Sequence, residues 1–186
     1  MGNPIEPLPV KLVMPMLSRE TRFFQLAQRA LGHHFGPVDY RSPELPFEHT
    51  TYYEEEFGSE LLRQFMAFER LADPGRLAQI KLLTNGLEQE WSVAGRRRIN
   101  LDPGYISASK FVLATTKNHG HRIYLGQGIY AEVTLTYRDK DYRPWPWTYP
   151  DYRSEAYLAI LRAIRGIYMA QLKAVRAARR TTRRSG

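Results

Sequence analysis

The sequence contains no cysteine. Disulfide bonds, thiolate catalysis and thiolate metal ligands are therefore excluded, and this composition agrees with a reducing compartment. Long apolar runs are also missing. No window approaches the ~20 apolar residues of a membrane span, and the first residues lack the basic start and apolar run of a secretion signal. We therefore expect a soluble, cytoplasmic protein.

The sequence also lacks acidic residues beyond position 161. From Arg162 onward there are eight basic residues and no acid, whereas residues 1–161 contain 19 basic and 19 acidic residues. The net charge of +8 therefore comes from the C-terminal end alone. We expect residues 173–186 to form a basic, frayed or disordered tail, for which a nucleic acid or another anionic surface is the candidate partner.

Common catalytic signatures are absent as well. There is no GxGxxG, no phosphate-loop lysine motif, no HExxH and no GxSxG. The sequence therefore gives no indication of the usual dinucleotide, nucleoside triphosphate, metalloprotease or serine hydrolase sites, and no cofactor is predicted.

What is present indicates a single α+β domain over residues 1–172. Apolar and turn patterns predict a strand in KLVMPML, a helix capped by Ser18, two extended segments up to residue 58, a helix over residues 59–71, a helix from Asp73-Pro74 to Trp91, and a last helix from Ser154. This order resembles a ferredoxin-like split unit. We expect a mixed or antiparallel sheet with helices packed on one face, extended by a β-meander and the C-terminal helix.

Polar residues concentrate in TTKNHGHRIYLGQGIYAEV, residues 115–133. Turns at residues 119–120 and 126–128 predict two hairpins. Counting register then places Arg122 opposite both Lys117 and Glu132, with Thr115, Tyr124 and Tyr130 in the next row of the same face. The opposite face would be core: Ala114, Ile123, Leu125, Ile129, Ala131, Val133 and Leu135. Two facing cations favour a nearby anion, which is Glu132 itself or a bound phosphate or carboxylate; a solvated face is the alternative.

Three other polar groups have two interpretations each. Lys81, Asn85 and Glu88 follow one helix stripe, which lines a cleft or forms an ordinary helix shoulder. The acids of TTYYEEEFG could hold a metal or act as acid and base, or simply favour a helix N-terminus. Asp102 precedes a Pro-Gly turn and serves as a base or bonds local amides. The His119 and His121 pair is a weak zinc motif, and we predict no metal site.

Taken together, TTYYEEEFG, the K..TN..E pattern from Lys81, NLDPGY, TTKNHGHRIYL, GIYAEVTL and YPDYRS resemble the bacterial and archaeal family catalogued as domain of unknown function 4416. The resemblance covers roughly residues 8–172 and implies no activity. It implies signature positions that are mostly polar: Tyr53, Glu56, Lys81, Asn85, Asp102, Lys117, His121, Arg122, Tyr124, Glu132, Asp151 and Arg153. A family marked by such residues is expected to keep a site.

The leading hypothesis is an enzyme that acts on a small anionic substrate, phosphorylated or nucleotide-like, in a polar cleft. Lys117 and Arg122 would hold the anion, His121 or Asp102 would move a proton, and Glu132 would orient Arg122. The candidate catalytic residues are Asp102, His121 and Glu132. The candidate substrate-binding residues are Tyr53, Glu56, Lys81, Asn85, Glu88, Lys117, Asn118, Arg122, Tyr124, Asp151 and Arg153.

Two other functions remain open from the sequence. The first is a nucleic-acid-binding or ribosome-associated module that uses the basic residues 173–186. The second is a structural or oligomer-forming protein that uses the aromatic segment WPWTYPDY as its interface.

Overall fold

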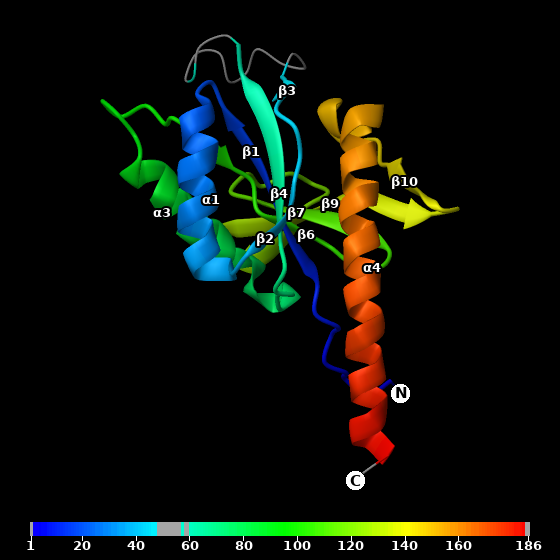
Figure 1. Cartoon of the computed structure of the whole chain (residues 1–186). Helices are drawn as coiled ribbons and strands as arrows, with labels where there is room; N and C mark the ends of the chain where they lie inside the picture. The colour runs from blue at the N-terminus through cyan, green and yellow to red at the C-terminus, as the bar shows by residue number, and fades with distance from the viewer. Residues whose placement is uncertain (1, 48–56, 58–59, 185–186) are drawn as a thin grey trace.

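The computed structural model describes residues 2–47, 57 and 60–184, with side chains up to residue 177 (Figure 1). A single antiparallel sheet forms the centre of the described part, with seven of its ten strands in the order β10-β9-β7-β6-β1-β4-β2. The strands are β1 (Lys11–Ser18), β2 (Val38–Arg41), β3 (Leu45–Pro46), β4 (Leu62–Phe68), β5 (Asn100–Leu101), β6 (Gly104–Ile106), β7 (Lys110–Thr115), β8 (Ile123–Gly126), β9 (Ile129–Arg138) and β10 (Asp141–Pro144). The helices are α1 (Thr21–Phe35), α3 (Leu77–Glu90) and α4 (Glu155–Arg184), with 3₁₀ turns η1 (Pro74–Arg76) and η2 (Asp151–Arg153).

The first half of the chain has the expected ferredoxin-like order. The elements β1, α1, β2, β4, α3 and β5–β6 follow one another along the chain, and their strands lie in the order β6-β1-β4-β2 with antiparallel neighbours. Strands β7, β9 and β10 extend the sheet beyond β6, and α4 follows them. The α+β class and the extended ferredoxin-like core are confirmed.

The helices cover both faces of this sheet, so the expectation of helices on one face is wrong for α4. Figure 1 shows α1 and α3 on one side and α4 on the other. Phe24 of α1 packs in one core with Met14 of β1, whereas Leu161 of α4 packs in a second core with Val13 and Phe65. The cause is visible in KLVMPML, because a strand that is buried on both faces has a continuous apolar run.

The predicted helix over residues 59–71 is also wrong, because this segment contains β4. Phe65 pairs with Pro15 of β1, and Met66 pairs with Arg41 of β2. Every residue from Arg63 to Phe68 is buried. Burial on both faces removes the alternation typical of a strand, and the spacing of its large apolar residues then imitates a helix.

The other helix predictions agree with the structure, with changes at the ends. The Asp73-Pro74 start is confirmed, since Asp73 Oδ1 accepts a hydrogen bond from the Gly75 amide at 2.8 Å. Ser18 is the last residue of β1 and does not cap α1, which begins at Thr21. Helix α4 continues to Arg184, so residues 173–184 are helical. No helix in the described part is long and apolar enough to cross a membrane.

Of the two predicted hairpins, only β8–β9 forms. Tyr124 pairs with Tyr130, as register counting predicts. However, Tyr130 also pairs with Thr115 of β7, so β9 lies between β7 and β8. Residues 116–122 therefore cross from β7 to β8 instead of joining two paired strands, although they contain a local turn in which the Arg122 amide donates to the His119 carbonyl at 2.9 Å. For this reason Lys117 does not lie opposite Arg122 in a β ladder.

The predicted core face of these strands is buried only in part. Ala114 and Ile129 are buried beside α3, whereas Ile123 and Leu125 of β8 are 67% and 41% exposed. A β-bulge changes the face of Leu135. Val112 pairs with Val133 and the preceding Phe111 pairs with Leu135, so Leu135 joins the α4 core while Val133 packs beside α3.

Candidate functional site

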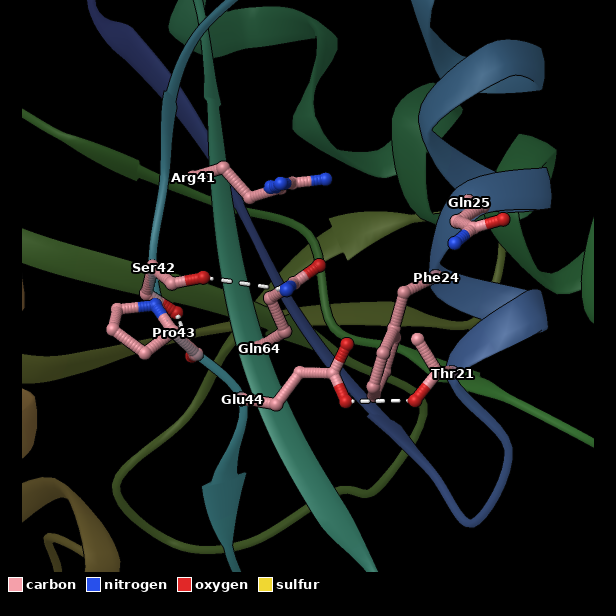
Figure 2. A pocket seen from close by; sticks show the side chains of 8 residues that line it. All are labelled: Thr21, Phe24, Gln25, Arg41, Ser42, Pro43, Glu44 and Gln64. Carbon is pink, nitrogen blue, oxygen red and sulfur yellow. Dashed lines mark hydrogen bonds between the residues drawn. The ribbon is translucent and has the colours of Figure 1, made fainter.

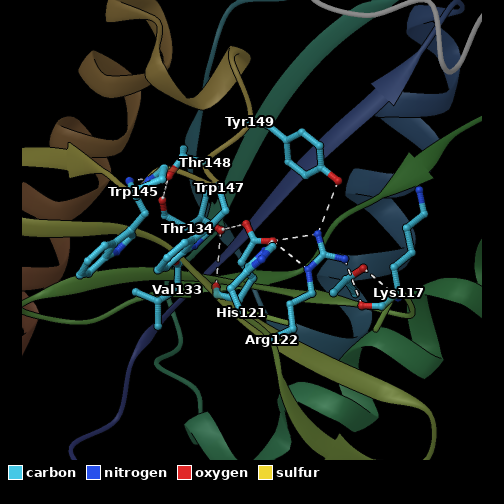
Figure 3. Close-up of polar contacts among 12 residues, drawn as sticks. Lys117, His121, Arg122, Val133, Thr134, Trp145, Trp147, Thr148 and Tyr149 are labelled. Atoms are coloured by element: carbon cyan, nitrogen blue, oxygen red, sulfur yellow. Dashed lines mark hydrogen bonds and ion pairs between the residues drawn. The ribbon is translucent and has the colours of Figure 1, made fainter. Parts of the chain in front are cut away.

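The predicted site residues take part in two groups of polar side chains, each centred on a buried charged residue. The first, here named the Glu132 cluster, consists of His121, Arg122, Glu132, Thr134 and Tyr149 (Figure 3). The second, the Arg63 cluster, lies around the gap between β5 and β6. It consists of Arg63, Lys81, Glu88, Arg97, Asn100, Asp102 and Asp151.

The carboxylate of Glu132 is the centre of the first cluster. Glu132 pairs with Leu113 across the sheet, on the α4 side, and its side chain is 3% exposed. Oε2 accepts a hydrogen bond from Arg122 Nε at 2.8 Å and lies 3.0 Å from His121 Nε2. Oε1 accepts a hydrogen bond from Thr134 Oγ1 at 3.2 Å. Both carboxylate oxygens are therefore paired, as burial of a charge requires.

Arg122 is committed to groups of the protein. Its side chain is 3% exposed, and Nη1 donates to the Lys117 carbonyl at 3.0 Å while Nη2 lies 3.5 Å from Tyr149 Oη. These contacts attach the crossing segment 116–122 to β9 and to the connection after β10. The contact with Glu132, which the register predicted, is present.

His121 is more accessible than its partners, with 22% of its side chain exposed. Its ring stacks on Trp147 with 5.1 Å between centroids, and Trp147 stacks on Trp145 at 5.0 Å. Because a carboxylate only accepts, the neutral imidazole carries its proton on Nε2, toward Glu132. The unprotonated Nδ1 has no hydrogen-bond partner among the described residues. Such a nitrogen can take up a proton.

The connection from Trp145 to Arg153 covers this cluster. Thr148 Oγ1 donates to the Thr134 carbonyl at 2.6 Å, and Trp147 Nε1 donates to the Val133 carbonyl at 3.2 Å. Arg153, a predicted substrate-binding residue, donates to the Thr148 carbonyl at 2.8 Å and to two further carbonyls of the same connection. Arg153 therefore holds the connection that positions Trp147.

The Arg63 cluster surrounds Asp102 at a break in the sheet. Asp102 lies opposite Pro15, which has no amide hydrogen, and its own amide donates to the Pro15 carbonyl at 2.9 Å. The Asp102 carboxylate accepts a hydrogen bond from Asn100 at 2.7 Å and lies 3.4 Å from Arg63 and 3.7 Å from Lys81. Asp102 therefore has two basic partners and the Asn100 side-chain amide, and no described hydrogen bond joins its carboxylate to the local backbone amides that the sequence predicts.

Leu101 of β5 pairs with Met16 of β1, and two charged residues of α3 bond its remaining backbone groups. Lys81 Nζ donates to the Leu101 carbonyl at 2.7 Å, and the Leu101 amide donates to Glu88 Oε1 at 2.6 Å. Burial raises the pKa of Glu88, while Lys81, this amide and Arg97 oppose the rise. Lys81 and Glu88 thus belong to the buried side of α3 and hold β5 in place.

Arg63 connects this cluster to the connection after β10. Its buried guanidinium lies 3.5 Å from Asp151 and 5.0 Å from the ring centre of Phe47. Burial would lower the pKa of Arg63, but neighbouring tyrosines and carboxylates outweigh it and hold that pKa above its ordinary value. Burial also raises the pKa of Tyr157 to about 12. Arg63 Nε has no described hydrogen-bond partner although it is buried.

The structure therefore divides the predicted site residues between two places. His121, Arg122 and Glu132 meet in one cluster, with the Lys117 main chain beside them, whereas Lys81, Glu88, Asp102 and Asp151 meet in the other. No described hydrogen bond or ion pair joins Asp102 to His121, Arg122 or Glu132. Four predicted residues have no polar side-chain contact in either cluster: Asn85, Asn118, Tyr124 and Arg153. Tyr53 and Glu56 lie outside the described residues.

Sequence reasoning missed Arg63, Arg97, Trp147 and Tyr149. Arg63 could be found only with β4 assigned as a buried strand, because an arginine buried in such a strand needs a partner. No local sequence pattern indicates a role for Trp147, because only the tertiary structure brings its ring next to His121.

Two surface depressions of the described part lie away from both clusters. One of about 300 Å³ is lined by residues of α1 and of the segment after β2, with Thr21 Oγ1 donating to Glu44 at 2.8 Å (Figure 2). Gln64 lines it from β4 on the face opposite Phe65, so this depression is on the α1 side of the sheet. Neither it nor a second one at the end of α1 includes a residue of the two clusters. Among the described residues, no group of three histidine or acidic side chains could hold a metal ion.

Fold and site together define an α+β protein with a ferredoxin-like core, helices on both faces, and two buried polar clusters. The family model described as Domain of unknown function (DUF4416) matches residues 8–168, and the chain belongs to this family. Comparison with curated proteins and with solved structures gave no match.

Proposed function

We propose that the chain is an enzyme that moves a proton on a small anionic substrate, with His121 as general acid and base. The observation that carries this proposal is the 3.0 Å contact between His121 Nε2 and the buried Glu132 Oε2. A histidine oriented by a buried carboxylate, with its second nitrogen accessible, is the arrangement used for proton transfer in many unrelated folds.

The rest of the cluster supports this role. Arg122 and Thr134 already satisfy both oxygens of Glu132, so the contact with His121 is not needed to compensate the buried charge. Trp147 stacks on the ring of His121 and fixes the plane of that ring. The imidazole is therefore held in position and tautomer while part of it stays exposed to solvent.

The surrounding charges favour an anionic substrate. Lys117 is exposed on the segment that carries His121, and Arg122 Nη2, which pairs with Glu132 Oε2 at 2.8 Å, also lies 3.5 Å from Tyr149 Oη. A phosphate or carboxylate beside these cations would place the rest of the substrate near His121 Nδ1. Asp102 is the weaker candidate for the proton carrier, because it lies in the other cluster between basic residues.

The tautomer of His121 tests the proposal without a substrate. In long-range ¹H–¹⁵N spectra of the neutral ring, we expect the proton on Nε2 in the wild type, because Glu132 accepts it. Glu132→Gln should mix the two tautomers, since an amide both donates and accepts. The neighbouring His119, whose ring centre is 5.9 Å from that of His121, should keep its spectrum in this variant.

Turnover tests the proposal directly. Phosphorylated and carboxylated metabolites that raise the melting temperature would be followed by NMR for conversion. His121→Gln should reduce the rate of conversion about 10²–10⁴-fold, the usual contribution of a general acid or base. His119→Gln is the matched control and should retain the rate. Equal rates for the wild type and His121→Gln, or a neutral His121 protonated on Nδ1, would disprove the proposed role.

A further inference from the structure

Helix α4 extends beyond the core that it covers. Leu172 is the last buried residue among its described side chains, which reach residue 177, and Tyr168, one turn earlier, still donates to the Pro9 carbonyl at 3.0 Å. Lys173 and Arg176 are exposed, and the helix continues to Arg184. Figure 1 shows this last part of α4 running past the strands. At 1.5 Å per residue, positions 173–184 form an arm of about 18 Å.

The arm is strongly basic along one side. Positions 173, 176, 180 and 183 are Lys or Arg at three- and four-residue steps, and Arg184 follows position 180 by four, which places all five on one face of a helix. Arg179 flanks this face, and residues 173–184 include no acid. These residues define what we call the basic arm.

The basic residues closer to the core have partners in the body of the protein. Arg162 pairs with Asp141 at 3.0 Å and also with Glu155, and Arg165 donates to the Ala108 carbonyl at 2.8 Å. Since residues 1–161 carry equal numbers of basic and acidic residues, the uncompensated charge of the molecule is concentrated in the arm. A surface with this charge attracts polyanions.

The composition of the arm distinguishes between two polyanions. A helix that binds a membrane surface needs large apolar side chains on its second face. Residues 173–184 contain only Val175 of this type, and Val175 is half-buried against the body. A nucleic acid backbone needs only regularly spaced cations. We infer that the basic arm of α4 binds the phosphate backbone of a nucleic acid, without base specificity.

The test measures binding of the full chain to labelled RNA and DNA duplexes by fluorescence anisotropy, as a function of salt. Five contacts predict a slope of log K against log salt of about −4 to −5, since each neutralised phosphate contributes about −0.9. The variant Lys173→Gln, Arg176→Gln, Arg180→Gln, Arg183→Gln should bind at least about 100-fold more weakly at low salt, with a slope near −1. Its melting temperature should be unchanged, because the core ends at Leu172.

Two control variants separate the arm from net charge alone. The first removes four exposed cations of the body through Arg22→Gln, Arg29→Gln, Arg138→Gln and Arg143→Gln, and should retain most of the affinity. The second keeps the composition but moves two charges off the face, through Arg176→Ala with Ala178→Arg and Arg180→Thr with Thr182→Arg. We expect this rearranged arm to bind about tenfold more weakly than the wild type, because it presents two fewer phosphate contacts on one face.

Several results would overturn this inference. They are equal weakening by the arm and body variants, full affinity of the rearranged arm, and binding to phosphatidylserine vesicles without binding to either duplex. The inference is independent of the proposed enzyme activity, so His121→Gln should bind duplexes as the wild type does.

Discussion

At the scale of single residues, Lys11 connects three parts of the molecule. It lies in the middle of the fold with no exposed surface, and its ammonium group donates to Asp39 of β2 and to Gln171 of α4, the latter at 3.0 Å. Burial lowers the pKa of Lys11, while the hydrogen bond with Asp39 opposes this shift. The folded protein therefore favours the neutral form of this lysine more than the unfolded chain does.

Replacement of Lys11 should change how stability depends on pH. Because the pKa of Lys11 is lower in the folded state than its ordinary value of 10.5, the folded state binds fewer protons as the pH approaches that value. The unfolding free energy of the wild type, relative to Lys11→Met, should therefore rise with pH up to about 10.5 and fall as the pH decreases. Urea unfolding of both proteins across the alkaline range measures this difference.

Buried tyrosines with raised pKa values lower the unfolding free energy of both proteins above pH 10. Taking the difference between wild type and Lys11→Met removes this shared effect. A difference that is flat or decreases with pH would contradict the assignment.

At the scale of elements, strand β6 packs too closely on β7 to accept a side chain at Gly104. A Cβ atom there would lie 2.3 Å from the Val112 carbonyl oxygen and 2.8 Å from the Leu113 side chain. Since β6 lies between β1 and β7, neither neighbour can move without disturbing the ladder. Glycine is therefore required at position 104, because a Cβ atom has no room there.

Gly104→Ala should lower the unfolding free energy by about 1–3 kcal/mol or more, the cost of overpacking a dense core. Gly86→Ala is the matched control in the middle of α3, where nothing lies within 4 Å of the added atom. It should stabilise the protein by about 0.5–1 kcal/mol, because alanine favours a helix over glycine. Thermal and urea unfolding measure both effects. A stable Gly104→Ala variant would show that β6 and β7 can separate.

The elements also show what local sequence can and cannot predict. Helices α1 and α3 have one apolar face each, and the β8–β9 hairpin has a short glycine turn, so their signals are local and they were predicted. Strand β4 was missed because its two apolar faces belong to partners far away in sequence. The false β7–β8 hairpin arose for a related reason, since nothing in residues 115–124 indicates that β9 will pair with β7 in its place.

At the scale of the whole molecule, one sheet carries two cores. Phe24 of α1 is central to the core on one face, and Leu161 of α4 to the core on the other. Because alternate residues of β1 and β4 belong to opposite faces, loss of either core exposes the same strands. The two cores should therefore unfold together.

Phe24→Ala and Leu161→Ala should each lower the unfolding free energy by about 2–5 kcal/mol. Each should shift the whole transition without splitting it. Tryptophan fluorescence and far-UV circular dichroism should give coincident urea curves for the wild type and both variants. Separate transitions for the two probes would show that the two faces are independent.

The candidate site also belongs to this scale. The sequence singled out several polar residues that the fold brings together, including His121, Arg122 and Glu132, but it missed buried ones such as Lys11 and Arg63. It did not predict their division into two clusters. That division depends on the crossing of segment 116–122 and on the break opposite Pro15, which arise from pairings between distant strands.

The contact between Lys11 and Gln171 joins residues 160 positions apart, and that separation sets an order of events during protein synthesis. The strands under α1 can pair once residue 101 has left the ribosome, since α1, β1, β4 and β5 then all exist. The opposite face must wait for α4. Until α4 has been made, β1 and β4 lack the residues that cover one of their faces, so we expect the nascent chain to expose an apolar surface.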